Sequence, residues 1–375
     1  MEELKRLRHE LHKNPELSNQ ESGTALRLKF FLSRYRPDEL VQNVGGEGLL
    51  AVYNGLEPGP TVLFRADMDA LPITEINKLP YSSSKKGVGH MCGHDGHMTI
   101  LSGLAMQLHS KPPQRGRAML LFQPAEETGE GAARALADMI RQGYSPDYAF
   151  ALHNMPRYPL GSLLLSREVF AAASKGLVVK LTGHSSHAAE PEKGISPALA
   201  VARTIEGLIH LSKSAPGFED YILLTVIYAR LGEIAFGTTP GYAEVMATLR
   251  SFKNEDMALL TKLSEEIVRK VAAEQHLKAD ISYVEEFPAA VNSSDAIAYV
   301  EKAANQASIP IVELVKPNGW SEDFAHFCLH CKSAIFGLGS GVDHPELHRP
   351  DYDFPDEIIE PGVNLFHGIV RQLLG

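Results

Sequence analysis

Residues 61–69 read TVLFRADMD, a short apolar run that ends in two closely spaced acidic residues. An apolar run of this length is typical of a strand that is buried on both faces. The arrangement recurs at residues 118–122 (AMLLF), which lead into QPAEE, and at residues 148–152 (YAFAL), which lead into His153. Residues 98–109 lie between the first two runs and have helical periodicity. Strands that alternate with helices in this way predict an α/β fold with a mostly parallel sheet.

The segment from residue 175 to residue 288 has a different order of elements. It predicts a strand at 177–181, a helix at 197–211, strands at 221–229 and 242–252, a helix at 255–276 and a strand at 279–284. The order β-α-β-β-α-β is that of a ferredoxin-like unit, which can close its own core. A strand at 333–338 then resumes the earlier alternation. We therefore expect a catalytic domain of residues 1–174 and 289–375, interrupted by an inserted domain of residues 175–288.

The composition excludes several classes of partner and location. Among the 375 residues, 36 are Lys or Arg and 46 are Asp or Glu, which gives a net charge of −10. Nucleic acids and anionic membranes bind basic surfaces, so we expect neither as a partner. No apolar run approaches the roughly 18 residues of a membrane span, and the N-terminal MEELKRLRHELHKNPE is too charged for a signal peptide. Three cysteines cannot form a disulfide framework, which favours a cytoplasmic setting.

Side chains that bind metals gather where the predicted strands end. In open α/β sheets, ligands bind beyond the carboxyl ends of the strands, and the segment HMCGHDGH at residues 90–97 leads into the helix predicted beside them. One thiol, two imidazoles and two carboxylates would meet there, from Cys92, His94, His153, Glu126 and Glu127. Zinc-like divalent ions take this mixture of sulfur, nitrogen and oxygen ligands. The sequence therefore predicts a metal site at this edge of the sheet.

The two adjacent glutamates can divide the chemistry of a hydrolytic metal site. One could bind the metal while the other takes a proton from a water molecule that the metal activates. Asp69 is short and close by, so it could orient a ligating histidine. Plainer interpretations stay open for each motif: an exposed acidic pair for Glu126 and Glu127, a structural histidine for His153, and turn residues for Asp67 and Asp69. These motifs together at strand ends indicate a metal site much more specifically than any one of them does alone.

Two further motifs have structural interpretations. Cys328 and Cys331 have C-x-x-C spacing, but no second pair exists to complete a zinc ribbon, so we expect a core helix there. His184 and His187 follow a predicted strand of the inserted domain, and by themselves they are typical of a surface turn.

Seven motifs together resemble a known family. In chain order they are RADMDALP (65–72), HMCGHDGH (90–97), FQPAEETGEGA (122–132), ALHNMP (151–156), SHAAEP (186–191), SEDF (321–324) and ELHRPDYDF (346–354). Over nearly its whole length the chain is similar to the amidohydrolase branch of the aminoacylase/carboxypeptidase metallopeptidase family. That branch includes hippurate hydrolases, N-acyl-amino-acid amidohydrolases and N-acetyldiaminopimelate deacetylases. The resemblance implies a zinc-exopeptidase-like catalytic domain with an inserted ferredoxin-like dimerisation or lid domain.

The resemblance also implies roles for individual residues in the catalytic domain. It implies two divalent metal ions per chain (Zn, Mn, Co or Ni), with the ligands Cys92, His94, Glu127, His153 and His348. Glu126 is then the general base for a metal-activated water, and Asp69 supports the ligands from behind. Reasoning from the residues alone had not singled out His348.

In the inserted domain, the resemblance implies two residues that act on the substrate. His187 corresponds to a histidine that can reach a partner subunit's active site and stabilise the oxyanion, which implies a homodimer formed through residues 175–288. Arg250 corresponds to an arginine that is often used near the substrate carboxylate. Two positions depart from the family's pattern: Gly237 stands where an asparagine is common, and Glu192 stands where a histidine is common. The choice of substrate therefore does not transfer from any one relative.

From the residues and the resemblance together, we expect a metal-dependent enzyme that hydrolyses the amide bond of a small N-acyl amino acid. One alternative is a dipeptidase or carboxypeptidase. The other is a non-catalytic protein that binds a metal or a small molecule on the same fold.

Overall fold

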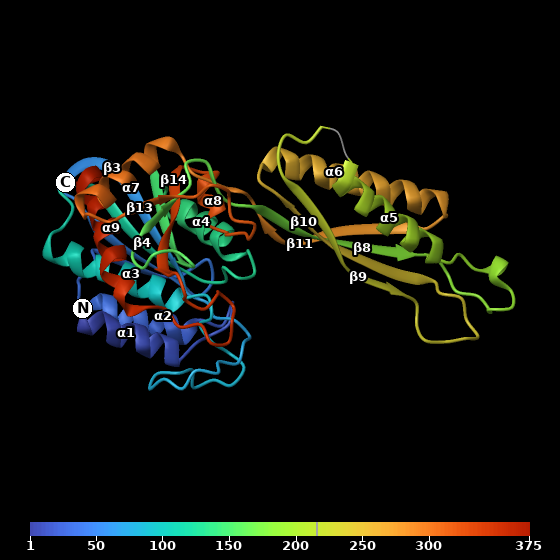
Figure 1. The fold of residues 1–375 in the computed structure, drawn as a ribbon, viewed down its shortest axis with the longest axis horizontal. Coiled ribbons are helices and arrows are strands. Elements are labelled where there is room, and N and C mark those ends of the chain that lie inside the picture. Colours follow the sequence, from blue (N-terminus) through green and yellow to red (C-terminus); the bar gives the residue numbers. More distant parts are fainter. Residues whose placement is uncertain (215–216) are drawn as a thin grey trace. The chain divides into compact units, whose positions relative to one another are not determined.

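The computed structural model describes residues 1–214 and 217–375, which form two compact units (Figure 1). The larger unit consists of Met1–Phe170, Ala290–Pro317 and Glu322–Gly375, and the smaller unit of Ala171–Ala289 and Asn318–Ser321. The return of residues 318–321 to the smaller unit has no counterpart in the sequence-based division at residues 175 and 288.

The larger unit is built on a mixed sheet that has eight strands among the described residues, in the order β1-β2-β4-β3-β5-β14-β6-β13. These strands are β1 (Glu39–Val44), β2 (Gly48–Asn54), β3 (Glu57–Asp67), β4 (Arg115–Gln123), β5 (Tyr148–Pro156), β6 (Leu163–Leu165), β13 (Ile311–Glu313) and β14 (Lys332–Gly341). The four central strands β4, β3, β5 and β14 pair in parallel. The sheet therefore has a parallel centre, as the apolar runs predict.

Helices cover both faces of this sheet. They are α1 (Glu2–Lys13), α2 (Ser22–Ser33), α3 (His94–Ser110), α4 (Gly131–Arg141), α7 (Ser294–Gln306), α8 (Ala325–Cys328) and α9 (Ile359–Leu373). Strand β4 lies on one side of β3 and β5 on the other, so right-handed crossovers place α3 and α4 on opposite faces. Helix α3 packs with α1 and α9, and α4 packs with α8. Within the described ranges, no helix is long and apolar enough to cross a membrane.

Helix α3 begins at His94, four residues before the start that the sequence predicts. Its N-cap is Gly93, whose φ of 90° lies in the left-handed region that glycine adopts readily. Residues 94–105 of α3 are all buried, so this part of the helix has no polar face that would reveal its first turn in the sequence. As a result, His94 belongs to the first turn of a helix whose N-terminus meets the ends of the strands.

The smaller unit is a four-stranded antiparallel sheet, counted over the described residues, in the order β11-β8-β10-β9. Its elements are β8 (Ala173–Thr182), α5 (Ala198–Ser214), β9 (Ile222–Leu231), β10 (Tyr242–Ser251), α6 (Asn254–Glu274) and β11 (Lys278–Phe287). The chain order is the predicted β-α-β-β-α-β, and an apolar core of its own joins the sheet to both helices. The short strands β7 (Val169–Ala171) and β12 (Ala290–Val291) mark the passages between the units. The expected α/β fold class is confirmed.

A buried polar network fixes helix α1 to the first turn of α3. His12 Nδ1 lies 2.9 Å from Asp95 Oδ2, and its Nε2 lies 3.4 Å from Glu75 Oε1. Arg8 donates to Asp353 (2.6 Å) and Asp356 (2.8 Å) near the C-terminus. His12, Asp95 and Arg8 are fully buried. Burial by itself lowers the pKa of His12, but the charge of Asp95 and the hydrogen bonds to both carboxylates raise it to about 9.

This network predicts a pH-dependent stability. The folded-state pKa of His12 is raised above its ordinary 6.5, so its stabilisation is complete below about pH 6.5 and is lost as the pH rises through about 9. The shift corresponds to up to about 3 kcal/mol in the free energy of unfolding. Urea unfolding at pH 6 and pH 9, with a metal chelator present, measures it. We expect the wild type to lose more stability over this interval than His12→Asn, and parallel losses would contradict the assignment.

Candidate metal centre

The parallel pairing of β4, β3 and β5 brings three polar segments to one edge of the sheet. Each segment lies close to the carboxyl end of its strand: residues 67–69 at the end of β3, residues 124–127 after β4, and His153 within β5, three residues before its end. The N-terminus of α3 adds Cys92 and His94 to the same edge. The convergence that the sequence predicts is therefore present in the structure.

The ligand-type atoms lie at distances that suit a bound metal ion. Cys92 Sγ is 3.5 Å from His153 Nε2. Glu127 Oε1 is 3.8 Å from His94 Nε2 and 3.7 Å from His348 Nε2. Two ligands of one tetrahedral zinc ion lie about 3.3–3.8 Å apart, because each bond is about 2.0–2.3 Å long. All five residues whose ligand role the family resemblance implies therefore belong to one cluster, and their role remains a prediction.

Two buried atoms of the cluster have no hydrogen-bond partner among the described residues, His94 Nε2 and Glu127 Oε1. The opposite ring nitrogen of His94 lies 2.8 Å from the backbone carbonyl of Asp69, which can only accept, so Nδ1 carries the hydrogen in the neutral ring. In that neutral ring Nε2 and the carboxylate oxygen are two acceptors that face each other. Burial lowers the pKa of His94, but the charges of Asp67 and Cys92 raise it well above its ordinary value, so Nε2 takes up either a proton or a cation. Buried acceptors at this distance need a donor or a cation between them, and a divalent cation fits the donor set.

The ring of His153 is oriented in the same way as that of His94. Its Nδ1 lies 2.8 Å from the backbone carbonyl of Asn154, which leaves Nε2 facing Cys92 Sγ. A histidine that donates one ring hydrogen to a carbonyl offers the other nitrogen to a metal. Both imidazoles are thus prepared as nitrogen ligands by backbone groups.

Acidic side chains are concentrated around this cluster. They are Asp67, Asp69, Glu126, Glu127, Glu322 and Asp323. The buried guanidinium of Arg65 contacts three of them, at 2.7–3.0 Å. Burial and then the charge of Glu322 raise the pKa of Glu126 well above its usual range, and burial and then Glu127 raise the pKa of the Cys92 thiol. Buried carboxyl groups in this number favour a bound cation that compensates their charge.

Asp69 holds both the two glutamates and the His94 ring, through different groups. Its carboxylate accepts the backbone N–H groups of Glu126 (3.1 Å) and Glu127 (3.0 Å) and the hydroxyl of Ser18 (2.7 Å). The His94 ring lies closer to the Asp69 carbonyl, at 2.8 Å, than to its carboxylate, at 3.5 Å. The sequence predicts that Asp69 orients a ligating histidine, and in the structure its carbonyl contacts the His94 ring while its carboxylate contacts the backbone of Glu126 and Glu127.

The plainer interpretations of the acidic motifs are wrong. Glu126 is only 7% exposed and Glu127 has 15% of its side chain exposed, so they are not a solvated pair. Asp67 and Asp69 are buried and hydrogen-bonded, which free turn residues are not. Asp67 contacts Arg65 and the ring of His97, at 2.7 and 2.6 Å.

His348 reaches the cluster from a loop rather than from a strand end. Its side chain is 52% exposed, and its φ of 64° lies in the left-handed region. Its backbone N–H donates to the carbonyl of Met91 at 2.7 Å, which ties the loop to the segment that carries Cys92. Periodicity gives no signal for such a contact, and this explains why only the family resemblance pointed to His348.

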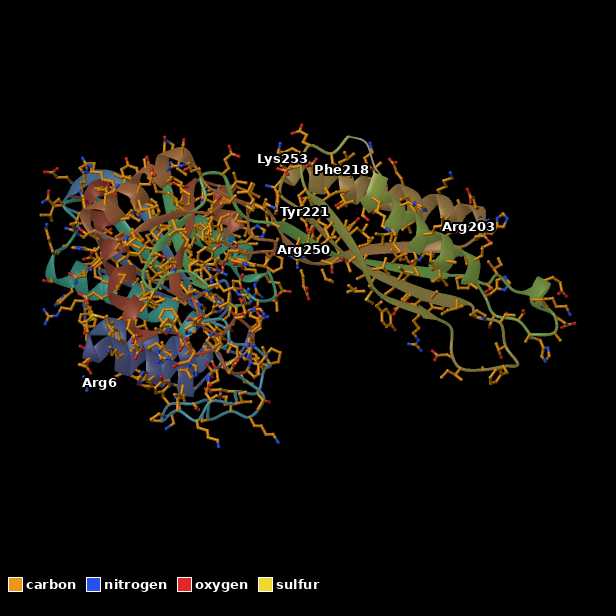
Figure 2. All side chains as sticks on the ribbon, in the orientation of Figure 1. Arg6, Arg203, Phe218, Tyr221, Arg250 and Lys253 are labelled. Carbon is orange, nitrogen blue, oxygen red and sulfur yellow. The ribbon has the colours of Figure 1, made fainter. Side chains whose placement is uncertain are left out.

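His187 and Arg250 both belong to the smaller unit. His187 is exposed, and its Nδ1 accepts the backbone N–H of Ala189 at 3.1 Å. Arg250 lies on β10 (Figure 2), and its guanidinium donates to the carbonyl of Gly319 (2.8 Å) and the hydroxyl of Ser321 (3.2 Å). These contacts, together with hydrogen bonds from the Ala172 N–H to the carbonyls of Asn318 and Trp320, hold residues 318–321 against the smaller unit.

The Cys328–Cys331 segment agrees only in part with the expected core helix, because Cys328 belongs to α8 and Cys331 lies beyond it. Helix α8 has four residues and ends at Cys328, and β14 starts at Lys332. Both thiols are free and half-buried. The helix cannot continue through Cys331, because strand β14 begins at the next residue, Lys332.

Comparisons with known proteins agree with this geometry. The model of peptidase family M20/M25/M40 matches residues 63–372. The N-acetyl-L-cysteine deacetylase of Bacillus subtilis (strain 168) is 30% identical over 377 residues, which cover 98% of this chain and 87% of the relative. The hippurate hydrolase of Campylobacter jejuni is 28% identical over 374 residues, which cover 99% and 97%.

Among solved structures, the crystal structure of the Bacillus subtilis YXEP protein is similar to this fold. It is described as a dinuclear metal binding peptidase from the M20 family, and it aligns with a TM-score of 0.84 and 25% identity over 100% of this chain and 98% of that one. The family that the motifs predict is confirmed. The predicted class of enzyme, a hydrolase that cleaves amide bonds, is confirmed as well. The chain belongs to peptidase family M20/M25/M40.

Proposed function

We propose that this protein hydrolyses the amide bond of small N-acyl amino acids. The observation that carries the proposal is the pair Glu126–Glu127: Glu127 faces two histidines with an unpartnered oxygen, and Glu126 lies beside it in the same buried cluster. This is the arrangement that a metal-dependent hydrolase needs, with one carboxylate that binds and a neighbour that moves a proton. The names of the matched deacetylase and hydrolase support N-acyl amino acids as the substrate class.

The proposal includes two divalent ions per chain. Two of the groups of ligand-type side chains together contain the five residues, and in each the ligand atoms lie within 4.8 Å of one another: Cys92, His94 and His153 in one, and Cys92, Glu127 and His348 in the other. Cys92 is common to both of these groups, so its thiolate would hold both ions if two were bound. The set of sulfur, nitrogen and oxygen ligands suits Zn, Mn, Co or Ni.

The chain's own residues supply the proton transfers. Divalent ions in such a site lower the pKa of water and polarise a carbonyl group. Glu126 takes the proton of the attacking water and later passes it to the leaving nitrogen. Asp69 holds the backbone of Glu126 and Glu127 during both steps. Arg250 is the proposed contact for the substrate carboxylate, and His187 the proposed donor to the oxyanion.

The substrate assay tests the function directly. Amine release is measured for a panel of N-acetyl and N-benzoyl amino acids, N-acetyldiaminopimelate and dipeptides, with stripped protein reloaded with Zn, Mn, Co or Ni. We expect turnover of acyl amino acids that depends on the metal. Faster turnover of dipeptides would identify a dipeptidase instead, and metal uptake without turnover of any substrate would favour the binding protein.

We also propose that the protein is a homodimer, paired through residues 175–288, in which His187 acts on the partner subunit's site. The test mixes two inactive variants, Glu126→Gln and His187→Ala, after subunit exchange. If His187 acts in trans, half of the randomly mixed dimers carry one intact site, so about a quarter of the wild-type activity returns. If His187 acts within its own chain, no activity returns. Sedimentation of the mixture confirms that dimers formed, and a fully active monomer would overturn the proposal.

A further inference from the structure

The turn that carries the two glutamates has an unusual backbone. Ala125, between β4 and Glu126, has a φ of 54° and is fully buried. This left-handed conformation is unfavourable for alanine, so the surrounding structure must stabilise it. The direction of the chain at Ala125 determines where the side chains of Glu126 and Glu127 begin.

A buried carboxylate from another element binds this turn. The backbone N–H of Ala125 donates to Glu21 Oε1 at 2.8 Å. Glu21 is fully buried, and no described residue hydrogen-bonds to its second oxygen. The next two N–H groups of the turn donate to Asp69. Three successive backbone donors are therefore bound by two carboxylates from behind the site.

Helix capping does not account for Glu21. It occupies the N-cap position of α2, but its side chain makes no capping hydrogen bond. That role belongs to Glu16, whose carboxylate accepts the backbone N–H of Thr24 (2.7 Å) and its hydroxyl (2.9 Å). Burial raises the pKa of Glu21 to about 7, which shows that this position is unfavourable for a charged carboxylate. Glu21 therefore makes its hydrogen bond to the turn rather than to its own helix.

We propose that Glu21 is a positioning residue, which holds Ala125 in the left-handed conformation and so aims Glu127 at the metal site and Glu126 at the substrate. This inference rests on the proposed function. It gives the N-terminal segment a part in forming the metal site. Among the described residues, the side chain of Glu21 hydrogen-bonds to the backbone of Ala125 and not to a ligand-type atom of the cluster.

The test separates the conformation of the turn from general stability. Glu21→Ala, Ala125→Gly, the double variant and Glu21→Gln are compared in three measurements: kcat and KM on the panel's best substrate, Zn²⁺ affinity of the stripped chain by competition with an indicator, and thermal unfolding. Glu16→Gln is the matched control, since it removes a half-buried hydrogen-bonded carboxylate from the same segment without touching the turn.

We expect Glu21→Ala to lower kcat and Zn²⁺ affinity by about 10- to 100-fold each, with KM little changed. Adding Ala125→Gly should restore most of both losses, because glycine adopts positive φ without strain. Glu21→Gln should keep most of both properties, since its amide oxygen can accept the same N–H. Glu16→Gln should lower only the unfolding temperature.

Several outcomes would overturn the proposal. One is that Glu21→Ala keeps the kcat and the Zn²⁺ affinity of the wild type. Another is that Glu21→Ala loses both, and that adding Ala125→Gly restores neither. If Glu21→Ala fails to fold, recovery of folding by Ala125→Gly supports the proposal, and failure of both variants contradicts it. The Zn²⁺ arm decides the role of Glu21 even if no N-acyl amino acid is hydrolysed, so failure of the proposed function is recognised separately.

Discussion

Glu126→Gln keeps its bound metal but loses amide hydrolysis by about 10³- to 10⁴-fold, if Glu126 is the general base. Glutamine has nearly the same shape and retains an oxygen, so the cluster around Glu127 should stay in place. It cannot take a proton from water at any accessible pH. We therefore expect the loss in kcat, with little change in KM. Steady-state kinetics and metal analysis of the same sample measure both halves of this expectation.

The control for this variant comes from the same loop. Glu130 lies four residues further on, and 58% of its side chain is exposed. Glu130→Gln removes the same charge from the protein without altering the buried cluster, so kcat should stay near that of the wild type. An active Glu126→Gln enzyme would reject Glu126 as the base. Loss of metal in that variant would show that Glu126 serves as a ligand instead.

Cys92→Ala is expected to lose metal and activity together. Cys92 is the residue that the two groups of proposed ligands have in common, so its removal would weaken the binding of both proposed ions. The effect should exceed the roughly 10- to 100-fold weakening that follows from loss of an outer partner of a ligand. Metal content after dialysis and Zn²⁺ affinity by indicator competition provide the measurement.

A second free cysteine offers the matched comparison for Cys92. Cys331 is half-buried, and its thiol contacts the backbone carbonyl of Phe327 rather than a ligand-type group. Cys331→Ala therefore removes a thiol and leaves the metal site intact, so full metal content is expected. Full metal occupancy in Cys92→Ala would refute its role as a ligand. High activity of Cys92→Ala would refute the proposal that Cys92 bridges the two ions.

The helices and strands of this chain could be predicted from the sequence because buried positions recur with the period of the helix or strand that carries them. The runs at 61–65, 118–122 and 148–152 all fall inside parallel strands, and every element of the smaller unit was anticipated within a few residues. Helix α3 was placed too late because its first turn is buried on all sides, so His94 and Asp95 have no periodic context. The short strands β6 and β13 have only three residues each and give no pattern of their own.

The candidate site could be predicted only where side-chain type coincides with a strand end or a local cluster. His153 and the glutamate pair meet that condition, and Cys92 and His94 stand out as a Cys/His cluster that leads into a predicted helix. His348 and Glu21 do not, since each reaches the site through backbone conformation and long-range contact: a left-handed loop residue in one case and a bond from α2 to Ala125 in the other. Arg65 was also missed, because a charged residue in an apolar run gives no sign that buried carboxylates surround it.

The position of β14 in the large sheet has a consequence for how the molecule folds. It pairs with β5, and the first partners are Lys332 and Tyr148. Along the sequence, the whole smaller unit lies between these two residues. Contacts between such distant segments form slowly, because a long loop must close first. Early folding of the smaller unit would shorten that loop, and His348 follows β14 in the chain. The complete ligand set therefore exists only in the nearly finished fold, and refolding experiments should find metal uptake among the last events.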